Sequence, residues 1–158
     1  KLNNLKNIKA ENYAISNYKD KSISFFAQKN SDNMGRSSLK HNYDIKEHEK
    51  IIVQNIRLDE KFAESNDPVL LIKIDTQGTE LQVLKSGEKT IEKFRPMILL
   101  EFEDRYFSDE ERITTKIELN EFFDNLNYSL FNISKGLDYY PLIDITKNYH
   151  GDIMATPR

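Results

Sequence analysis

Short apolar runs and stretches of helical periodicity alternate along the chain and predict a definite order of elements. Alternating or continuous apolar positions of four to nine residues are typical of strands, and apolar positions three and four residues apart are typical of helices. Residues 29–49 are polar with little periodicity and predict a long loop. The expected strands lie at 8–16, 22–28, 50–58, 69–75, 97–102, 128–133 and 151–156, and the expected helices begin near residue 79 and span 113–126.

The strand expected at 69–75 is the most informative of these elements. Its run is nearly continuously apolar and partly β-branched, which suits a strand covered on both faces, as in a parallel sheet. The helix that follows begins at Thr79, which forms a capping-box pattern with Gln82. Gly87 punctuates this helical segment. Three apolar side chains are expected near one face of it: Leu81, Leu84 and Ile91.

From residue 69 onward the order is strand, helix, strand, helix, strand, strand. Strand–helix alternation predicts an α/β fold with a parallel sheet and right-handed crossovers. The last two strands have no helix between them, so they are expected to pair antiparallel at the end of the sheet. Neither an internal repeat nor a low-complexity linker is visible in the sequence, and residues 1–158 are interpreted as part of one domain.

Composition narrows the function classes. The chain has 158 residues, a net charge of −3 and no cysteine. No basic field is present to attract nucleic acid or an anionic membrane, and no apolar run approaches the roughly 20 residues that span a bilayer. Absence of cysteine excludes a disulfide framework, a thiolate zinc site and a cysteine nucleophile. It also fits a reducing compartment, so we expect a cytoplasmic protein with neither nucleic-acid nor membrane partners.

Asp75 is the leading candidate for chemistry because it ends the strand at 69–75 and precedes a turn and a helix. Ligands of open α/β sheets bind outside the carboxyl ends of the strands. A carboxylate at this place can accept a hydroxyl proton, orient a substrate or bind a cation. Gly78 would let a ligand approach the backbone closely. The alternative is that Asp75 caps the helix, where an acid is also favoured.

Three other charged residues belong to the same region. Lys73 lies two residues before Asp75, on the same side of the strand, and either helps to activate a hydroxyl or reaches water. Glu101 and Glu103 share one side of the next strand, with Phe102 opposite, so either one of them faces the site or both belong to a solvated acidic loop. The three histidines lack metal-ligand spacing, and no metal site is predicted: His41, His48 and His150.

One block of sequence resembles a known family. Residues 72–87 read IKIDTQGTELQVLKSG and residues 95–101 read RPMILLE. Together they resemble the signature block of the FkbM-type methyltransferases, and weaker similarity lies in GRSSL at 35–39, in NIRLD at 55–59 and in segments 123–128 and 152–157. The resemblance implies a class I methyltransferase fold, with a Rossmann-like, mostly parallel sheet whose last strand is reversed. It also implies methyl transfer from S-adenosyl-L-methionine to a hydroxyl of a sugar or another small or secondary metabolite.

The resemblance implies roles for individual residues. Asp75 would be the base or substrate orienter and would face both methyl donor and acceptor, with Lys73 and Glu101 assisting. The strand at 8–16 resembles the family's third strand, which ends near the adenine of the cofactor. The cofactor-binding residues implied are Ala14, Ile15, Ser16 and Asp75, and those implied for the substrate are Gln77, Gly78 and Glu80.

Two departures from the family pattern matter. Gln77 stands where many members have Glu, although Gln also occurs there. The family's first two strands, which carry a glycine-rich cofactor loop and a ribose-binding acid, are not visible before Lys1. The chain is therefore expected to be the C-terminal part of the domain, to bind cofactor poorly as given and to expose a sheet edge that promotes self-association. The alternatives are a truncated or non-catalytic α/β module and a magnesium-dependent phosphotransfer enzyme, although the latter's second acid is lacking after Asp75.

Overall fold

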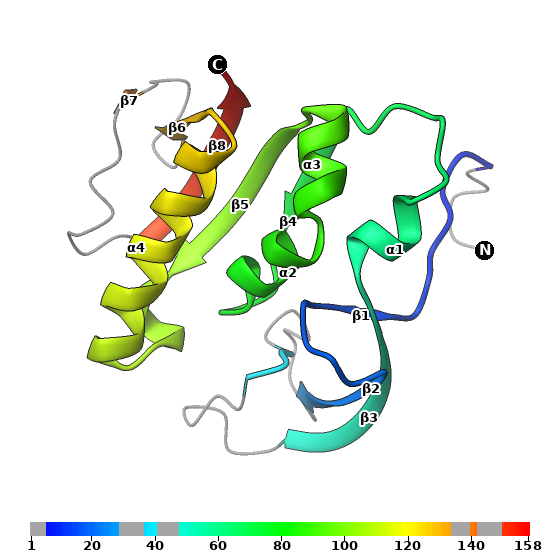
Figure 1. Cartoon of the computed structure of the whole chain (residues 1–158). Coiled ribbons are helices and arrows are strands. Elements are labelled where there is room, and N and C mark those ends of the chain that lie inside the picture. The colour runs from blue at the N-terminus through cyan, green and yellow to red at the C-terminus, as the bar shows by residue number, and fades with distance from the viewer. Residues whose placement is uncertain (1–5, 29–36, 41–47, 134–139, 142–149) are drawn as a thin grey trace.

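A computed structural model describes residues 6–28, 37–40, 48–133, 140–141 and 150–158. Within these residues the chain is a mixed α/β structure with two small sheets (Figure 1). The expected loop at 29–49 falls largely outside the described residues, as does the turn expected at 134–136.

The first sheet has the strand order β1-β3-β2. β2 (Ser22–Gln28) and β3 (His48–Ile56) form an antiparallel ladder, with Ser22 opposite Gln54 and Gln28 opposite His48. β1 (Ala14–Ile15) pairs parallel with the end of β3. The strand predicted at 8–16 is therefore wrong over most of its length, because only its residues 14 and 15 pair with a neighbouring strand. The strand predicted at 50–58 begins and ends two residues earlier.

The second sheet has the order β4-β5-β8-β6-β7 and is mixed. Its strands are β4 (Leu71–Ile74), β5 (Met97–Glu103), β6 (Tyr128–Asn132), β7 (Tyr140–Pro141) and β8 (His150–Pro157). β4 and β5 are parallel, whereas β8 runs antiparallel to both β5 and β6. The reversed last strand is thus confirmed. The mostly parallel sheet is not, because β8 lies between β5 and β6 and makes both of its own ladders antiparallel.

Three helices accompany this second sheet. α2 (Glu80–Ser86) and α3 (Glu88–Phe94) join at Gly87, and α4 (Asp109–Asn125) connects β5 to β6 after a short 3-10 turn at Asp104–Tyr106. Figure 1 shows α2 and α3 in front of β4, with α4 in front of β6 and β8. The prediction of one helix starting at Thr79 is corrected to two helices. Thr79 makes no side-chain cap, and the capping box lies at Ser108 and Glu111 instead.

The core lies between these helices and the sheet. Leu81, Leu84 and Ile91 are buried as predicted, together with Phe123 and Tyr128. Two apolar residues of α4 lie outside this core. Ile113 and Ile117 of α4 are 53% and 45% exposed, because the inward face of that helix passes through the buried Lys116. The Lys116 ammonium lies 5.8 Å from the ring centroid of Phe102, with its aliphatic stem in the core.

β4 is covered on one face only. Ile74 is 2% exposed, but Leu71 is 54% exposed and Lys73 also faces outward. The prediction of a strand buried on both faces is therefore wrong. Its physical reason is position: among the described residues β4 pairs on one side only, with β5, and it lies at the edge of its sheet. A short helix that the pattern did not predict, α1 (Leu58–Phe62), follows β3 and buries Leu58.

Candidate functional site

The candidate site is built on the turn that connects β4 to α2. Gln77 and Gly78 have φ angles of 57° and 98°, which reverse the chain in the left-handed region. Gly78 is required there for a second reason, because a Cβ at this position would lie 2.7 Å from the Cβ of Tyr106. The turn is therefore pressed against the segment that follows β5.

Glu80 holds this turn from the inside. Its Oε1 accepts hydrogen bonds from the Thr76 amide at 3.2 Å, the Thr76 hydroxyl at 3.3 Å and the Gly78 amide at 3.0 Å. The residue is only 3% exposed. Burial raises the pKa of Glu80, and the hydrogen bonds oppose that rise only in part. The side chain thus satisfies donors in the turn that the start of α2 would otherwise leave unpaired.

Asp75 is half-exposed at the end of β4, and Gln77 orients its side chain. Gln77 Nε2 donates a hydrogen bond to Asp75 Oδ1 at 2.7 Å, and the Tyr106 hydroxyl donates to Gln77 Oε1. The N-cap of α2 is Thr79. Among the described residues, the hydrogen bond to Asp75 comes from a side chain and not from the helix backbone. This arrangement does not support the reading of Asp75 as a helix cap.

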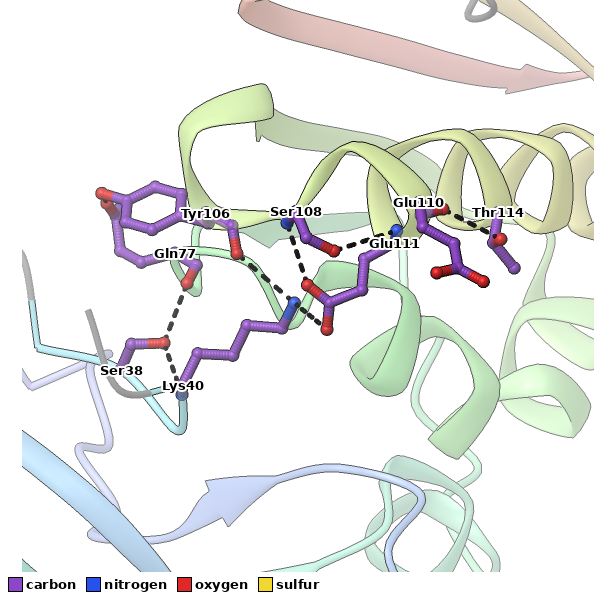
Figure 2. Close-up of polar contacts among 8 residues, drawn as sticks. All are labelled: Ser38, Lys40, Gln77, Tyr106, Ser108, Glu110, Glu111 and Thr114. Atoms are coloured by element: carbon purple, nitrogen blue, oxygen red, sulfur yellow. Dashed lines mark hydrogen bonds and ion pairs between the residues drawn. The ribbon is translucent and has the colours of Figure 1, made fainter. Parts of the chain in front are cut away.

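A segment from the first sheet closes over the turn. Ser38 pairs with Phe26 of β2 through two backbone hydrogen bonds. Its hydroxyl oxygen lies 2.8 Å from the Gln77 carbonyl and 3.2 Å from the Thr76 carbonyl, so that its one proton is shared between them. Figure 2 shows this contact beside the Gln77 and Tyr106 side chains. Ser38 therefore connects the two sheets at the candidate site.

Lys40 extends the same connection to α4. Its ammonium lies 3.4 Å from the Tyr106 carbonyl oxygen and 3.7 Å from Glu111 Oε1 (Figure 2). The same ammonium lies 4.0 Å from the centroid of the Phe107 ring. Burial lowers the pKa of Lys40 despite the nearby carboxylates. Sequence reasoning did not single out Lys40 or Tyr106, because neither belongs to a recognisable spacing. Their role depends on three distant segments meeting.

β5 supplies the second acid of the site. Phe102 is buried while Glu101 and Glu103 are partly exposed, which confirms their predicted alternation. Burial raises the pKa of Glu101 to about 7, with hydrogen bonding and repulsion from Asp75 and then Glu103 adding to the effect. Glu103 forms an ion pair with Arg105. The parallel pairing of β4 and β5 thus brings Asp75 and Glu101 together at neighbouring strand ends.

Lys73 lies between two carboxylates. Its ammonium is 3.9 Å from Asp75 Oδ2 and 3.9 Å from Asp152 Oδ1. Its side chain is 48% exposed, so these contacts contribute little to stability. The structure places Lys73 beside Asp75, and an assisting role stays a prediction.

A cavity of about 470 Å³ adjoins these groups. Ala14 and Ile15 line one part of it, and Ile72, Ile74 and Asp75 of the β4 region line another. Its volume is within the range of small-molecule sites, and its lining is mainly apolar with a few polar groups, as is typical of them. The structure therefore brings three of the four residues predicted to bind cofactor to one cavity.

Ser16, the fourth, has other partners. It is fully buried, its hydroxyl donates to Asn55 Oδ1 at 2.9 Å and its oxygen accepts from the Tyr18 amide at 3.3 Å. The three residues predicted to contact substrate are also engaged with protein groups. Gln77 contacts Asp75 and Tyr106, Gly78 is buried, and Glu80 binds the turn. Contact of these residues with substrate stays a prediction.

The described residues contain neither a metal-binding cluster nor a membrane-spanning helix. No group of three or more His, Cys, Asp or Glu side chains is placed to hold a metal ion in the part of the chain that the structure describes. Likewise, no helix within the described ranges is long and apolar enough to cross a bilayer. His41 lies outside those ranges, His48 begins β3 and His150 begins β8.

Comparison with known proteins decides the family. The family model for the methyltransferase FkbM domain matches residues 2–130, which is most of the chain. The chain belongs to the FkbM methyltransferase family. This match includes Ala14, Asp75 and Glu101, so the candidate site of this FkbM domain lies inside the matched region, and methyltransferase activity is supported. Among curated proteins and among solved structures, no match was found.

Proposed function

We propose that this FkbM domain takes part in S-adenosyl-L-methionine-dependent O-methylation of a hydroxyl on a sugar or another small or secondary metabolite. The observation that carries the proposal is the Asp75–Glu101 carboxyl pair, of which Asp75 lines the 470 Å³ cavity together with Ala14 and Ile15. The parallel pair β4 and β5 and the reversed strand β8 support a class I methyltransferase arrangement. Ligands of such sheets bind at the carboxyl ends of the parallel strands.

The residues present suit the cofactor chemically. An apolar wall at Ala14 and Ile15 suits the flat adenine ring, and the carboxylate of Asp75 suits a positively charged ligand. When bound, the cofactor supplies a methyl group on a positively charged sulfur. Ala14, Ile15 and Asp75 would hold it, while Ser16 would fix the end of β1 through Asn55.

The Asp75–Glu101 pair would accept the proton of the acceptor hydroxyl. When an acceptor hydroxyl is methylated, its proton would pass to a carboxylate oxygen of this pair. Asp75 is half-exposed and held by Gln77, so it can act as base or as orienter. With its pKa raised to about 7, Glu101 is suited to exchange protons near neutral pH. Lys73, whose ammonium lies 3.9 Å from Asp75 Oδ2, would help to orient that carboxylate.

The test is calorimetric titration of S-adenosylhomocysteine into the natural full-length protein. We expect saturable binding, which an Ala14→Trp variant abolishes by filling the cavity. Ile113→Trp is the matched control, because Ile113 is exposed on α4 and is not among the residues that line the cavity. Asp75→Asn should retain the fold and lose methyl transfer to hydroxyl acceptors. Absence of binding by the wild-type protein would favour the non-catalytic α/β module.

A further inference from the structure

The Asp75 side chain needs an external support to keep one orientation. It is 45% exposed, so packing alone does not restrict its rotation. Its two oxygens have different neighbours: Oδ1 accepts from Gln77 Nε2 at 2.7 Å, and Oδ2 lies 3.9 Å from the Lys73 ammonium. The charge-assisted hydrogen bond from Gln77 is the shorter contact and the one with directional geometry.

The Gln77 amide is itself directed by Tyr106. A carboxamide has a donor end and an acceptor end, and a half-turn exchanges them. The Tyr106 hydroxyl donates to Gln77 Oε1, so the acceptor end of the amide faces Tyr106 and the donor end faces Asp75. If the amide were reversed, its NH₂ group would face a hydroxyl and its oxygen would face a carboxylate.

Tyr106 is held in place by its contacts with the turn between β4 and α2 and with Lys40. Its Cβ lies against Gly78, where a Cβ would be only 2.7 Å away, and its carbonyl accepts a hydrogen bond from Lys40 at 3.4 Å. Gln77 has a φ of 57°, which is costly for a residue with a Cβ. Glu80 and Ser38 hold the backbone in that conformation, and the Gln77 side chain is thereby aimed between Tyr106 and Asp75.

We propose that Tyr106, acting through the Gln77 amide, is a positioning residue that fixes the orientation of the Asp75 carboxylate. This inference deepens the proposed function and rests on it for the role of Asp75. It assigns Gln77 a specific task as well: an amide at this position donates to Asp75, whereas a glutamate would place another negative charge beside the acid pair.

The charges around Asp75 determine how a Gln77→Glu substitution would change the pKa of Glu101. Lys73 lies beside Asp75 on β4 and faces Asp152 of β8 as well. Glu101 and Glu103 lie on the neighbouring strand β5. Arg105 pairs with Glu103 and also lies over the Tyr106 ring. The Lys40 ammonium contacts the carbonyl oxygen of Tyr106. Because Asp75 and Glu103 already raise the pKa of Glu101 by repulsion, a further carboxylate at position 77 is expected to raise that pKa above its value of about 7.

The experiment compares Tyr106→Phe, Gln77→Glu and the control Tyr18→Phe in the full chain by NMR, without cofactor or acceptor. In the wild type, the two protons of the Gln77 side-chain amide should have well-separated shifts, since one donates to Asp75. Tyr106→Phe should bring them to the shifts of the exposed Gln54 amide. Gln77→Glu should raise the pKa of Glu101 by about one unit, read from its carboxyl carbon. Tyr18→Phe should change neither signal.

Unchanged Gln77 amide shifts in Tyr106→Phe would overturn the proposal, and so would a Glu101 pKa that does not move in Gln77→Glu. Loss of thermal stability alone, with the Gln77 signals intact, would mean that Tyr106 only packs and would also overturn it. The NMR readout is independent of methyl transfer. If the signals change as expected but S-adenosylhomocysteine does not bind the natural full-length protein, the positioning of Asp75 holds and the proposed function fails.

Discussion

Replacing Gly78 by alanine tests the central geometric claim about the candidate site. Two costs arise at this position. An L-residue in the left-handed region costs about 1–2 kcal/mol, and Gly78 has a φ of 98°. The added Cβ would also lie 2.7 Å from the Tyr106 Cβ, an atom next to backbone that cannot move away alone, and such overpacking costs about 1–3 kcal/mol. Together they predict a destabilisation of about 2–5 kcal/mol.

Urea unfolding followed by far-UV circular dichroism measures this cost, with the unfolding midpoint and slope compared between variants. A loss of this size corresponds to a fall in Tm of roughly 5–15 °C for a domain of about 150 residues. The slope should stay unchanged, because the substitution acts on the folded state.

A double-mutant cycle separates the two costs. In a Tyr106→Gly background the overlapping Cβ is absent, so Gly78→Ala should cost only about 1–2 kcal/mol for its backbone conformation. The same cost in both backgrounds would refute the contact between the turn and Tyr106. A cost below about 1 kcal/mol in the wild-type background would refute both the strained φ and the overlap.

Three further predictions concern the same region and its helix. Glu80→Ala leaves the buried Gly78 amide and the partly buried Thr76 amide unpaired and should cost about 2–4 kcal/mol in chemical unfolding. The exposed Glu92→Ala should change stability by less than about 0.5 kcal/mol, and equal effects of the two substitutions would contradict the role of Glu80. Since the folded pKa of Glu101 is raised from 4.5 to about 7, its contribution to stability is present below pH 4.5 and is lost as pH rises through 7. Glu101→Gln should therefore raise Tm at pH 8 relative to the wild type and change it little at pH 4, and parallel pH curves for the two proteins would argue against this. Ser108→Ala removes the capping box of α4 and should cost about 0.5–2 kcal/mol, while Ser108→Asp should retain most of that stability; equal losses would exclude the cap.

The sequence alone determined the features that depend on neighbours along the chain. Alternation placed Phe102 in the core with Glu101 and Glu103 on the other side, because a strand has a side-chain period of two. The block around Asp75 was enough to identify the family and to put an acid at a strand end. The reversal of the final strand also followed from the predicted order of elements, since the sequence pattern predicts no helix between the last two expected strands, and β8 does pair antiparallel with β6.

Tertiary structure decided where each element is covered. An apolar run does not reveal whether its strand lies inside a sheet or at its edge, so the exposure of Leu71 was not visible in the pattern. The same holds for α4, whose buried face passes through Lys116 and leaves Ile117 exposed, because a long aliphatic stem can fill a core position. A hydrophobic side chain favours burial, but the neighbouring elements decide which face of a helix or strand is buried.

The chemistry of the site was likewise divided between the two levels. Asp75 was found from its place after a strand, but its partners come from elsewhere: Tyr106 from the turn after β5, and Ser38 from the first sheet. Glu101 acquires a pKa of about 7 because it is partly buried in the folded chain and because the pairing of β4 and β5 places it beside Asp75. The sequence specifies which groups can titrate or donate, whereas desolvation and distance, which set their strength, exist only in the folded chain.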